Sequence, residues 1–275
     1  MFHVCSCEVL RRACRYLAVA VLLLAVGQGG CGPAGERRSD GPRYEVRREA
    51  GPDGTGRYYM GREIARPLTD ADDAGWLERA ERESVELPDR LVEALGLKPT
   101  DIVADVGAGT GYFTFRLGKK VPYGKVYAVD IDPAMLDTIR TRMAARGVRN
   151  VIPVLGEPDD PHLPAGTIDV ALIVAAYHEF SHPYEMMQAI VRALKPGGRV
   201  VVVEYRGEDA TIPLPSLHRM TEAQLRREMT AAGLRWRETR EILPWQHFMV
   251  FEKPPTPGET GSGGIAPGNL ETARR

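Results

Sequence analysis

The chain has 275 residues, of which 43% are hydrophobic, enough for the core of one large or two small folded domains. Its 36 basic and 37 acidic residues leave a net charge of −1. Such a balance creates no overall field toward nucleic acid or an anionic membrane surface, so we expect no nucleic-acid partner.

Residues 1–31 have the pattern of an export segment. Arginines at 11, 12 and 15 precede the apolar run "LAVAVLLLAVG" at 17–27. As a helix this run would be about 16 Å long, about half of a hydrocarbon core, which is typical of a signal peptide. "GQGGC" resembles a bacterial lipobox and implies a lipid anchor at Cys31. We therefore predict an exported, membrane-anchored lipoprotein in the cell envelope. A later translation start would instead give a cytoplasmic protein.

Two segments flank the predicted folded domain. Residues 32–56 are rich in Gly, Pro and charge without periodic apolar positions, which indicates a flexible linker, and 254–275 have the composition of a disordered tail. The folded domain is predicted to span 57–253. All four cysteines lie within the first 31 residues, so this domain has no disulfide, thiolate metal site or cysteine nucleophile.

Short apolar runs alternate with amphipathic helical stretches inside the domain, which is typical of a mostly parallel sheet with helices on both faces. Helices are expected at about 133–146, capped by Asp132, at 183–194, and after the capping-box sequence Thr221–Gln224. Another helical region is expected near 74–95. Strands are expected at 101–106, 125–130, 150–155, 169–175 and 198–205, with two more in 235–253 around Pro244.

The best-defined motif is "VADVGAGTGYF" at 103–113. A strand ends near Val106, three glycines form a turn, and a helix follows, so a ligand can lie directly on the backbone. The spacing is G-x-G-x-G, with Tyr112 where a dinucleotide fingerprint has its third glycine. Asp105 just before the turn suits a cationic ligand better than a pyrophosphate.

Acidic side chains follow three successive predicted strands: Asp105 at the glycine turn, Asp130 after the next strand and Glu157 after the third. The carboxyl ends of parallel strands meet at one edge of a sheet. We therefore expect these carboxylates to face a common crevice, with Asp130 at the position where ribose hydroxyls are commonly held.

Together, "DVGAGTG", "VYAVDIDP", "LKPGGRVVVVEY" and the late helix and strands resemble the class I S-adenosylmethionine-dependent methyltransferases over nearly all of 57–253. The resemblance implies a Rossmann-like α/β fold with a seven-stranded, mostly parallel sheet and S-adenosyl-L-methionine as cofactor. It also implies site roles: Asp105, Gly107, Gly109 and Gly111 around the methionine part, Asp130 on the ribose, Ile131 on the adenine and Glu157 near the adenine amino group.

The upstream segment 57–97 is predicted to be an N-terminal cap. "YYMGREIA" at 58–65 and "WLERAERE" at 76–83 resemble the N-terminal segment of exported bacterial methyltransferases. In related folds such a segment covers the cofactor pocket, which makes Tyr59 and Arg62 candidates for the site. The alternative is a segment that only covers the edge of the sheet.

"HEFSH" at 178–182 matches the H-E-x-x-H pattern of zinc peptidases. That chemistry needs both histidines on one continuous helix, whereas Pro183 disfavours helical geometry at His182 and a buried strand runs to about 175. We therefore predict a strand-to-helix loop and no metal. In the family that the chain resembles, this loop faces the transferred methyl group. Tyr177, His178 and Glu179 are accordingly the candidate catalytic residues; the alternative is that His178 and Glu179 only hold the loop.

The sequence thus predicts methyl transfer from S-adenosylmethionine to a small-molecule nucleophile by direct displacement. A non-catalytic binding module of the same fold on the cell envelope is the second hypothesis, because an exported protein leaves the compartment where this cofactor is made. A zinc metallopeptidase is the third.

Overall fold

A computed structural model describes residues 43–67, 75 and 77–255. The predictions for 1–31, including Cys31, and for most of the tail fall outside these residues. Within the described part of the chain, no helix combines the length and apolar character that a membrane span requires.

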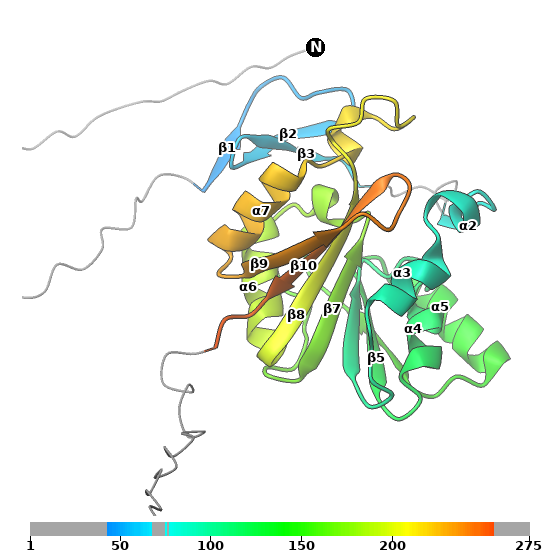
Figure 1. The fold of residues 1–275 in the computed structure, drawn as a ribbon. Coiled ribbons are helices and arrows are strands. Elements are labelled where there is room, and N and C mark those ends of the chain that lie inside the picture. The colour runs from blue at the N-terminus through cyan, green and yellow to red at the C-terminus, as the bar shows by residue number, and fades with distance from the viewer. Residues whose placement is uncertain (1–42, 68–74, 76, 256–275) are drawn as a thin grey trace, which may run out of the picture. The chain divides into compact units, whose positions relative to one another are not determined.

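The centre of the domain is a seven-stranded sheet in the order β6-β5-β4-β7-β8-β10-β9 (Figure 1). The first five of these strands are mutually parallel, and β10 runs antiparallel to both β8 and β9. The fold predicted from the sequence is therefore confirmed. The strand bounds are β4 Ile102–Val106, β5 Lys125–Asp130, β6 Val151–Leu155, β7 Ile168–Val174, β8 Leu194–Tyr205, β9 Arg235–Arg240 and β10 Gln246–Glu252.

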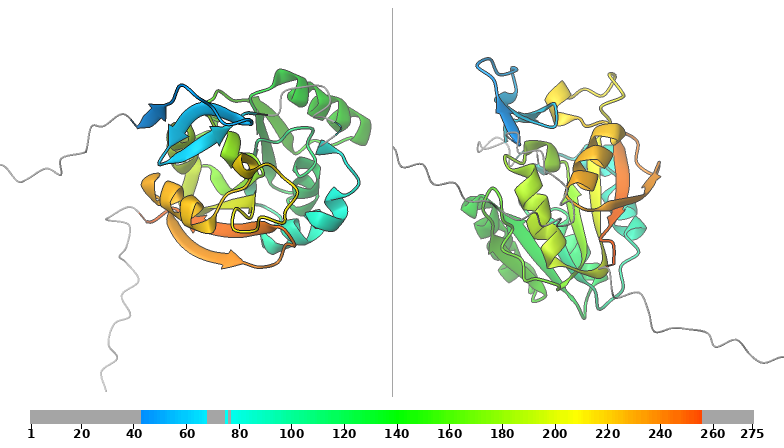
Figure 2. Two further views of the ribbon diagram at one scale, coloured as in Figure 1. Left: turned by 90° about the horizontal axis from the view of Figure 1, so that it is seen from above. Right: turned by 90° about the vertical axis from the view of Figure 1, so that its left-hand side faces the viewer.

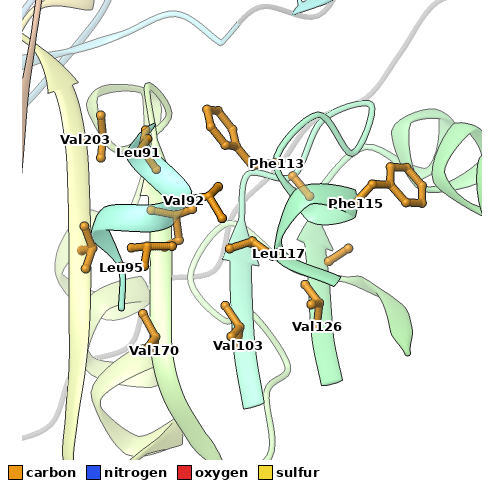
Figure 3. Close-up of a cluster of buried hydrophobic side chains, with 14 of the residues drawn as sticks. Leu91, Val92, Leu95, Val103, Phe113, Phe115, Leu117, Val126, Val170 and Val203 are labelled. Carbon is orange, nitrogen blue, oxygen red and sulfur yellow. The ribbon is translucent and has the colours of Figure 1, made fainter. Parts of the chain in front are cut away.

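Helices cover both faces of this sheet (Figures 1 and 2). Along β4, Val103 joins the core under one set of helices and Ala104 the core under the other, because successive strand residues point to opposite faces. Figure 3 shows the first of these two cores. Its helices are α3 Pro88–Ala94, α4 Thr114–Lys120 and α5 Pro133–Arg146; α6 Pro183–Ala193 and α7 Glu222–Ala231 cover the other face.

Both side-chain caps predicted from the sequence are present. The Asp132 carboxylate accepts a hydrogen bond from the Ala134 backbone N–H at 2.8 Å, and Pro133 occupies the first helical position. The Thr221 hydroxyl accepts from the Gln224 N–H at 3.2 Å. The Gln224 side chain, however, donates to Glu228 at 2.5 Å, so the side-chain half of the capping box is used elsewhere.

The helical region expected at 74–95 is interrupted. It contains α2 Arg82–Val85 and α3, separated by Leu87 in the left-handed conformation with a φ of 43°. The following Pro88 disfavours right-handed helical geometry at Leu87, and this accounts for the break.

Part of the predicted linker is ordered. β1 Tyr44–Val46 pairs with β2 Gly54–Tyr59, which pairs with β3 Arg62–Ala65 in a separate three-stranded sheet. The Tyr44 hydroxyl donates to Glu185 on α6, which anchors β1 on the main domain. Periodicity did not reveal this strand because it has three residues, two of them exposed.

Candidate functional site

The glycine loop between β4 and α4 has the backbone that the sequence predicts. Gly107, Gly109 and Gly111 all have positive φ values, of 78°, 53° and 86°. A Cβ at Gly107 would lie 2.7 Å from the Ala176 Cβ, so a side chain there would collide with the loop after β7. The glycine loop and the loop after β7 therefore lie against each other at the carboxyl edge of the sheet.

Asp105 lies beneath the glycine loop and is 3% exposed. The Thr114 hydroxyl donates to its carboxylate at 2.6 Å. Burial raises the pKa of Asp105 to about 6; the Thr114 hydrogen bond opposes this rise, and the nearby charge of Asp130 adds to it. The structure thus places Asp105 as a support of the loop, covered from solvent.

Asp130 ends β5 and clamps the glycine loop from the other side. One carboxylate oxygen accepts from the Gly109 N–H at 2.7 Å, and the other accepts from the Asp132 N–H at 2.9 Å. Burial raises the pKa of Asp130, and these backbone hydrogen bonds act in the opposite direction. A carboxylate has about four acceptor sites in all, so Asp130 keeps some acceptor capacity for a ligand hydroxyl.

Two apolar side chains are exposed at this same edge. Ile131 is 53% exposed and Leu155, the last residue of β6, is 51% exposed. Asp130 and Leu155 are partners in the β5–β6 register. Ile131, which follows Asp130, and Leu155 therefore lie at the ends of adjacent strands. Ile131 was predicted from the resemblance, whereas Leu155 was missed, although it ends the apolar run "VIPVL".

Glu157 is exposed, and one of its carboxylate oxygens lies 3.9 Å from His162 Nε2. The backbone joins its segment to the site, because the Gly156 N–H donates to the Asp130 carbonyl at 3.0 Å. Glu157 is therefore near Asp130 along the chain, without a side-chain contact that fixes its carboxylate in the crevice.

A part of the predicted cap lies on the glycine loop. Leu77 Cδ1 is 3.1 Å from the place where a Cβ at Gly109 would be. Next to it, Glu78 accepts hydrogen bonds from the Thr110 hydroxyl and from Arg142 Nη1, the latter at 2.7 Å. These contacts hold the segment around Glu78 against the loop and α5. A hollow of about 740 Å³ lies beside it and reaches Gly111, but Asp105, Asp130 and His178 do not line it.

The loop after β7 begins at Ala175, a non-glycine residue with a φ of 47°. A 3₁₀ turn, η1, then spans Tyr177–Glu179, and His182 precedes the first residue of α6. Such strain is concentrated at functional sites. His178 and His182 do not share a helix, which confirms the predicted strand-to-helix loop and removes the helical geometry of a zinc peptidase.

Tyr177 does not face the crevice. Its side chain is fully buried, and its hydroxyl donates to Glu228 on α7 at 2.9 Å. Burial, followed by the charge of Glu228, raises its pKa well above the usual value. Arg62 from β3 binds the same carboxylate through two hydrogen bonds of 2.9 and 3.0 Å and donates to the His178 carbonyl at 2.9 Å. Tyr177 and Arg62 therefore position the loop, in contrast to the acceptor-facing role predicted for Tyr177.

His178 is buried and touches three ionisable side chains. Its Nδ1 lies 2.8 Å from Glu204 at the end of β8, and its Nε2 lies 3.1 Å from His218 Nδ1 and 3.5 Å from Glu179. Burial lowers the pKa of His178, but the charge of Glu204 and the carboxylate of Glu179 outweigh it and raise the pKa to about 9. The pKa of His218 is lowered by burial and by the neighbouring His178.

Glu204 and His218 were missed in the sequence. Glu204 is the next-to-last residue of the predicted strand at 198–205, so an acid near the carboxyl edge was a usable signal. His218 lies in a short 3₁₀ turn, η2 Ser216–His218, which no periodicity marks.

Comparisons with known proteins agree with this architecture. Residues 103–198 match the family model of a methyltransferase domain. Over 116 residues the chain is 33% identical to the ubiquinone/menaquinone biosynthesis C-methyltransferase UbiE of Ectopseudomonas mendocina and 31% identical to that of Pseudomonas putida. Each alignment covers 42% of this chain and 45% of the relative, so the chain spans less than half the length of these relatives.

Solved structures share the fold over a larger part of the chain. A SAM-dependent methyltransferase from Aquifex aeolicus aligns with a TM-score of 0.64 and 24% identity over 68% of this chain and all of that one. The [4+2]-cyclase SpnF aligns with a TM-score of 0.54 and 18% identity over 62% of this chain and 82% of its own. A cyclase on the same fold shows that the fold alone does not determine the reaction. The chain therefore has the fold of the class I S-adenosylmethionine-dependent methyltransferases, and its residues 103–198, which include the glycine loop, match a methyltransferase domain.

Proposed function

We propose that the chain transfers a methyl group from S-adenosylmethionine to a small-molecule nucleophile by direct displacement. The observation that carries this proposal is the edge formed by the glycine loop, Asp130 and the exposed pair Ile131 and Leu155. An open glycine backbone, a carboxylate with remaining acceptor capacity and two exposed apolar side chains suit the amino-acid part, the ribose and the adenine of this cofactor. When bound, the cofactor supplies a methyl group on a sulfonium.

The chain's own residues divide the remaining work. The loop after β7 packs against the glycine loop where Ala176 meets Gly107, so in this proposal it borders the space for the methyl group. His178, with a pKa of about 9, carries a proton at neutral pH and is a poor general base there. Glu179, whose side chain is 19% exposed, is the better candidate to accept a proton from the acceptor.

The UbiE relatives bear on the acceptor only weakly. Their name specifies a carbon methylation in quinone biosynthesis, and an aromatic acceptor is accordingly the first class to assay. The family-model match ends at residue 198, before Glu204 and His218. The similarity therefore supports the cofactor half of the site more than the acceptor half.

Calorimetry with S-adenosylmethionine and S-adenosylhomocysteine tests cofactor binding. Asp130→Asn should weaken affinity by roughly 10- to 100-fold, since it removes a charge-assisted acceptor worth about 1.5–3 kcal/mol. The matched control is Asp137→Asn on α5, where the carboxylate is exposed and pairs with Arg140. Folding of both variants is checked by thermal unfolding. If the wild-type chain binds neither ligand, the proposal fails.

Turnover separates the enzyme from the non-catalytic binding module. Transfer of a labelled methyl group to a panel of phenolic, quinol and amine acceptors is the assay, with Glu179→Gln as the variant. Cofactor binding without transfer to any acceptor would favour the binding module.

We also propose that the chain is exported and anchored through Cys31. The support is the arginine-flanked apolar run and the lipobox-like "GQGGC". Labelling with a radioactive fatty acid should mark the wild-type chain in its native type of host and leave Cys31→Ser unlabelled. A wild-type chain that stays in the cytosol without label would contradict export.

A further inference from the structure

We infer that His178, Glu179 and His218 form a binding site for one divalent transition-metal ion, such as Zn²⁺ or Co²⁺. We call these three residues the metal trio. The site shares Glu179 with the proposed methyl transfer, but binding of the ion does not depend on that reaction. It also differs from the ligand set that the "HEFSH" pattern suggests, because His182 has no part in it.

The distances between the three candidate ligand atoms fit a single ion. His178 Nε2 lies 3.1 Å from His218 Nδ1 and 3.5 Å from Glu179 Oε1, and His218 Nδ1 lies 3.7 Å from the same Oε1. In the plane of the three atoms, the point equidistant from them lies about 2.0 Å from each. This is close to the typical zinc–nitrogen and zinc–oxygen distances of about 2.0–2.2 Å. An ion therefore fits among these atoms without movement of the backbone.

A buried carboxylate orients the first of these ligands. His178 Nδ1 lies 2.8 Å from Glu204 Oε2, and the Glu204 side chain is fully buried. Metal-binding histidines commonly donate their other ring N–H to such a carboxylate, which fixes the tautomer and directs the free nitrogen at the ion. Binding of the ion displaces any proton on His178 Nε2. The donor set of two imidazoles and one carboxylate suits Zn²⁺, Co²⁺ or Fe²⁺ better than Mg²⁺ or Ca²⁺.

The backbone around the trio is fixed, while one side stays accessible. Arg62 donates to the His178 carbonyl at 2.9 Å and so holds η1 in place. The side chains of His218 and Glu179 are 15% and 19% exposed, so an ion can enter from solvent. Three protein ligands leave at least one coordination position for water or another oxygen or nitrogen donor.

His182 is engaged elsewhere. Its Nδ1 lies 3.1 Å from the Ser181 hydroxyl, its ring packs edge-on against Tyr44 with centroids 6.0 Å apart, and it precedes the first residue of α6. This separation gives a sharp test, because a zinc-peptidase site would require His182 and the metal trio would not.

The test is a titration of the metal-free full-length chain with Co²⁺, followed by its visible absorption and by competition with Zn²⁺. Cys5, Cys7, Cys14 and Cys31 are replaced by Ser in every variant, so that thiolates cannot bind the ion. We expect one Co²⁺ per chain. His218→Gln and Glu179→Gln should weaken binding by at least about 100-fold, and Glu204→Gln by about 10- to 100-fold as a positioning residue.

His182→Ala is the matched control and should bind Co²⁺ like the parent. Because His178 is buried against Glu204, its replacement could prevent folding; the partly exposed His218 and Glu179 therefore carry the test, with circular dichroism as the check of folding. Bound metal should also raise the midpoint of thermal unfolding in the parent and in His182→Ala, but not in folded His218→Gln. A folded parent without a stoichiometric complex would overturn the inference. Binding that His182→Ala abolishes and His218→Gln preserves would overturn it too.

Discussion

Replacing Asp105 with Asn should stabilise the fold in a way that depends on pH. The carboxylate is 3% exposed, and burial raises its pKa from 3.8 to about 6. The folded state thus holds the Asp105 proton more tightly than the unfolded chain does. A raised carboxyl pKa contributes stability that is complete below about pH 3.8 and is lost as the pH rises through about 6.

The size of the effect follows from the pKa difference. A shift from 3.8 to about 6 corresponds to about 3 kcal/mol of lost stability once Asp105 is ionised in both states. Asn has no such charge, and its side-chain oxygen can still accept from the Thr114 hydroxyl. Between about pH 5 and pH 8 the wild type should therefore lose stability relative to Asp105→Asn. The difference between their free energies of unfolding, variant minus wild type, should rise by about 1.5 kcal/mol.

Urea unfolding of both proteins across this pH range measures the difference directly. All other titrating groups are common to the two proteins and cancel to a first approximation. Poor packing of the new amide would shift the whole curve by a constant and leave its pH dependence unchanged. A difference that stays flat, or that falls with rising pH, would refute the assignment of Asp105 as a buried, destabilised carboxylate.

Two further substitutions test the packing around the site. Gly107→Ala should lower stability by more than Gly147→Ala in thermal unfolding, because both positions have positive φ but only a Cβ at Gly107 meets another atom, at 2.7 Å. The backbone strain of an alanine at positive φ, about 1–2 kcal/mol, is common to both variants. Equal losses of stability in the two variants would show that the loop after β7 does not pack tightly against the glycine loop. Arg62→Ala should lower the free energy of unfolding by about 3–5 kcal/mol, because it leaves the fully buried Glu228 without its cation. The double variant Arg62→Met, Glu228→Gln removes both charges and should recover much of that loss. A single-variant loss below about 1 kcal/mol in urea unfolding, the range of a surface ion pair, would contradict this assignment.

The sheet could be predicted because its signals are local. The five parallel strands read as apolar runs because most of them are buried on both faces, and glycines, prolines and capping residues mark their ends. The Gly107 turn and Asp130 follow from the same reasoning, because residues just after parallel strands meet at one edge. The small sheet of β1, β2 and β3 was not predicted, and neither was the break at Leu87. The position of β1 depends on a tertiary anchor, and the break depends on a single proline.

The side-chain network around His178 was beyond sequence reasoning for a different reason. Its partner Glu204 lies near the end of β8, and His178 lies in the loop that follows β7. The two residues meet only because β7 and β8 are neighbours in the sheet. His218 arrives through a turn that follows β8 and packs on η1. Neither contact has a characteristic spacing along the chain.

The "HEFSH" segment shows how such contacts decide the meaning of a motif. In a continuous helix, residues four positions apart lie on one face, and the two histidines would meet a common ion. Here Ala175 and Pro183 confine helical geometry to a single 3₁₀ turn, which separates His178 from His182 and turns His178 toward η2. The pattern thus singled out His178 and His182 as a pair, whereas the histidine that His178 contacts is His218. A metal titration that distinguishes His182 from His218 therefore tests the geometry of the loop as well as the ion.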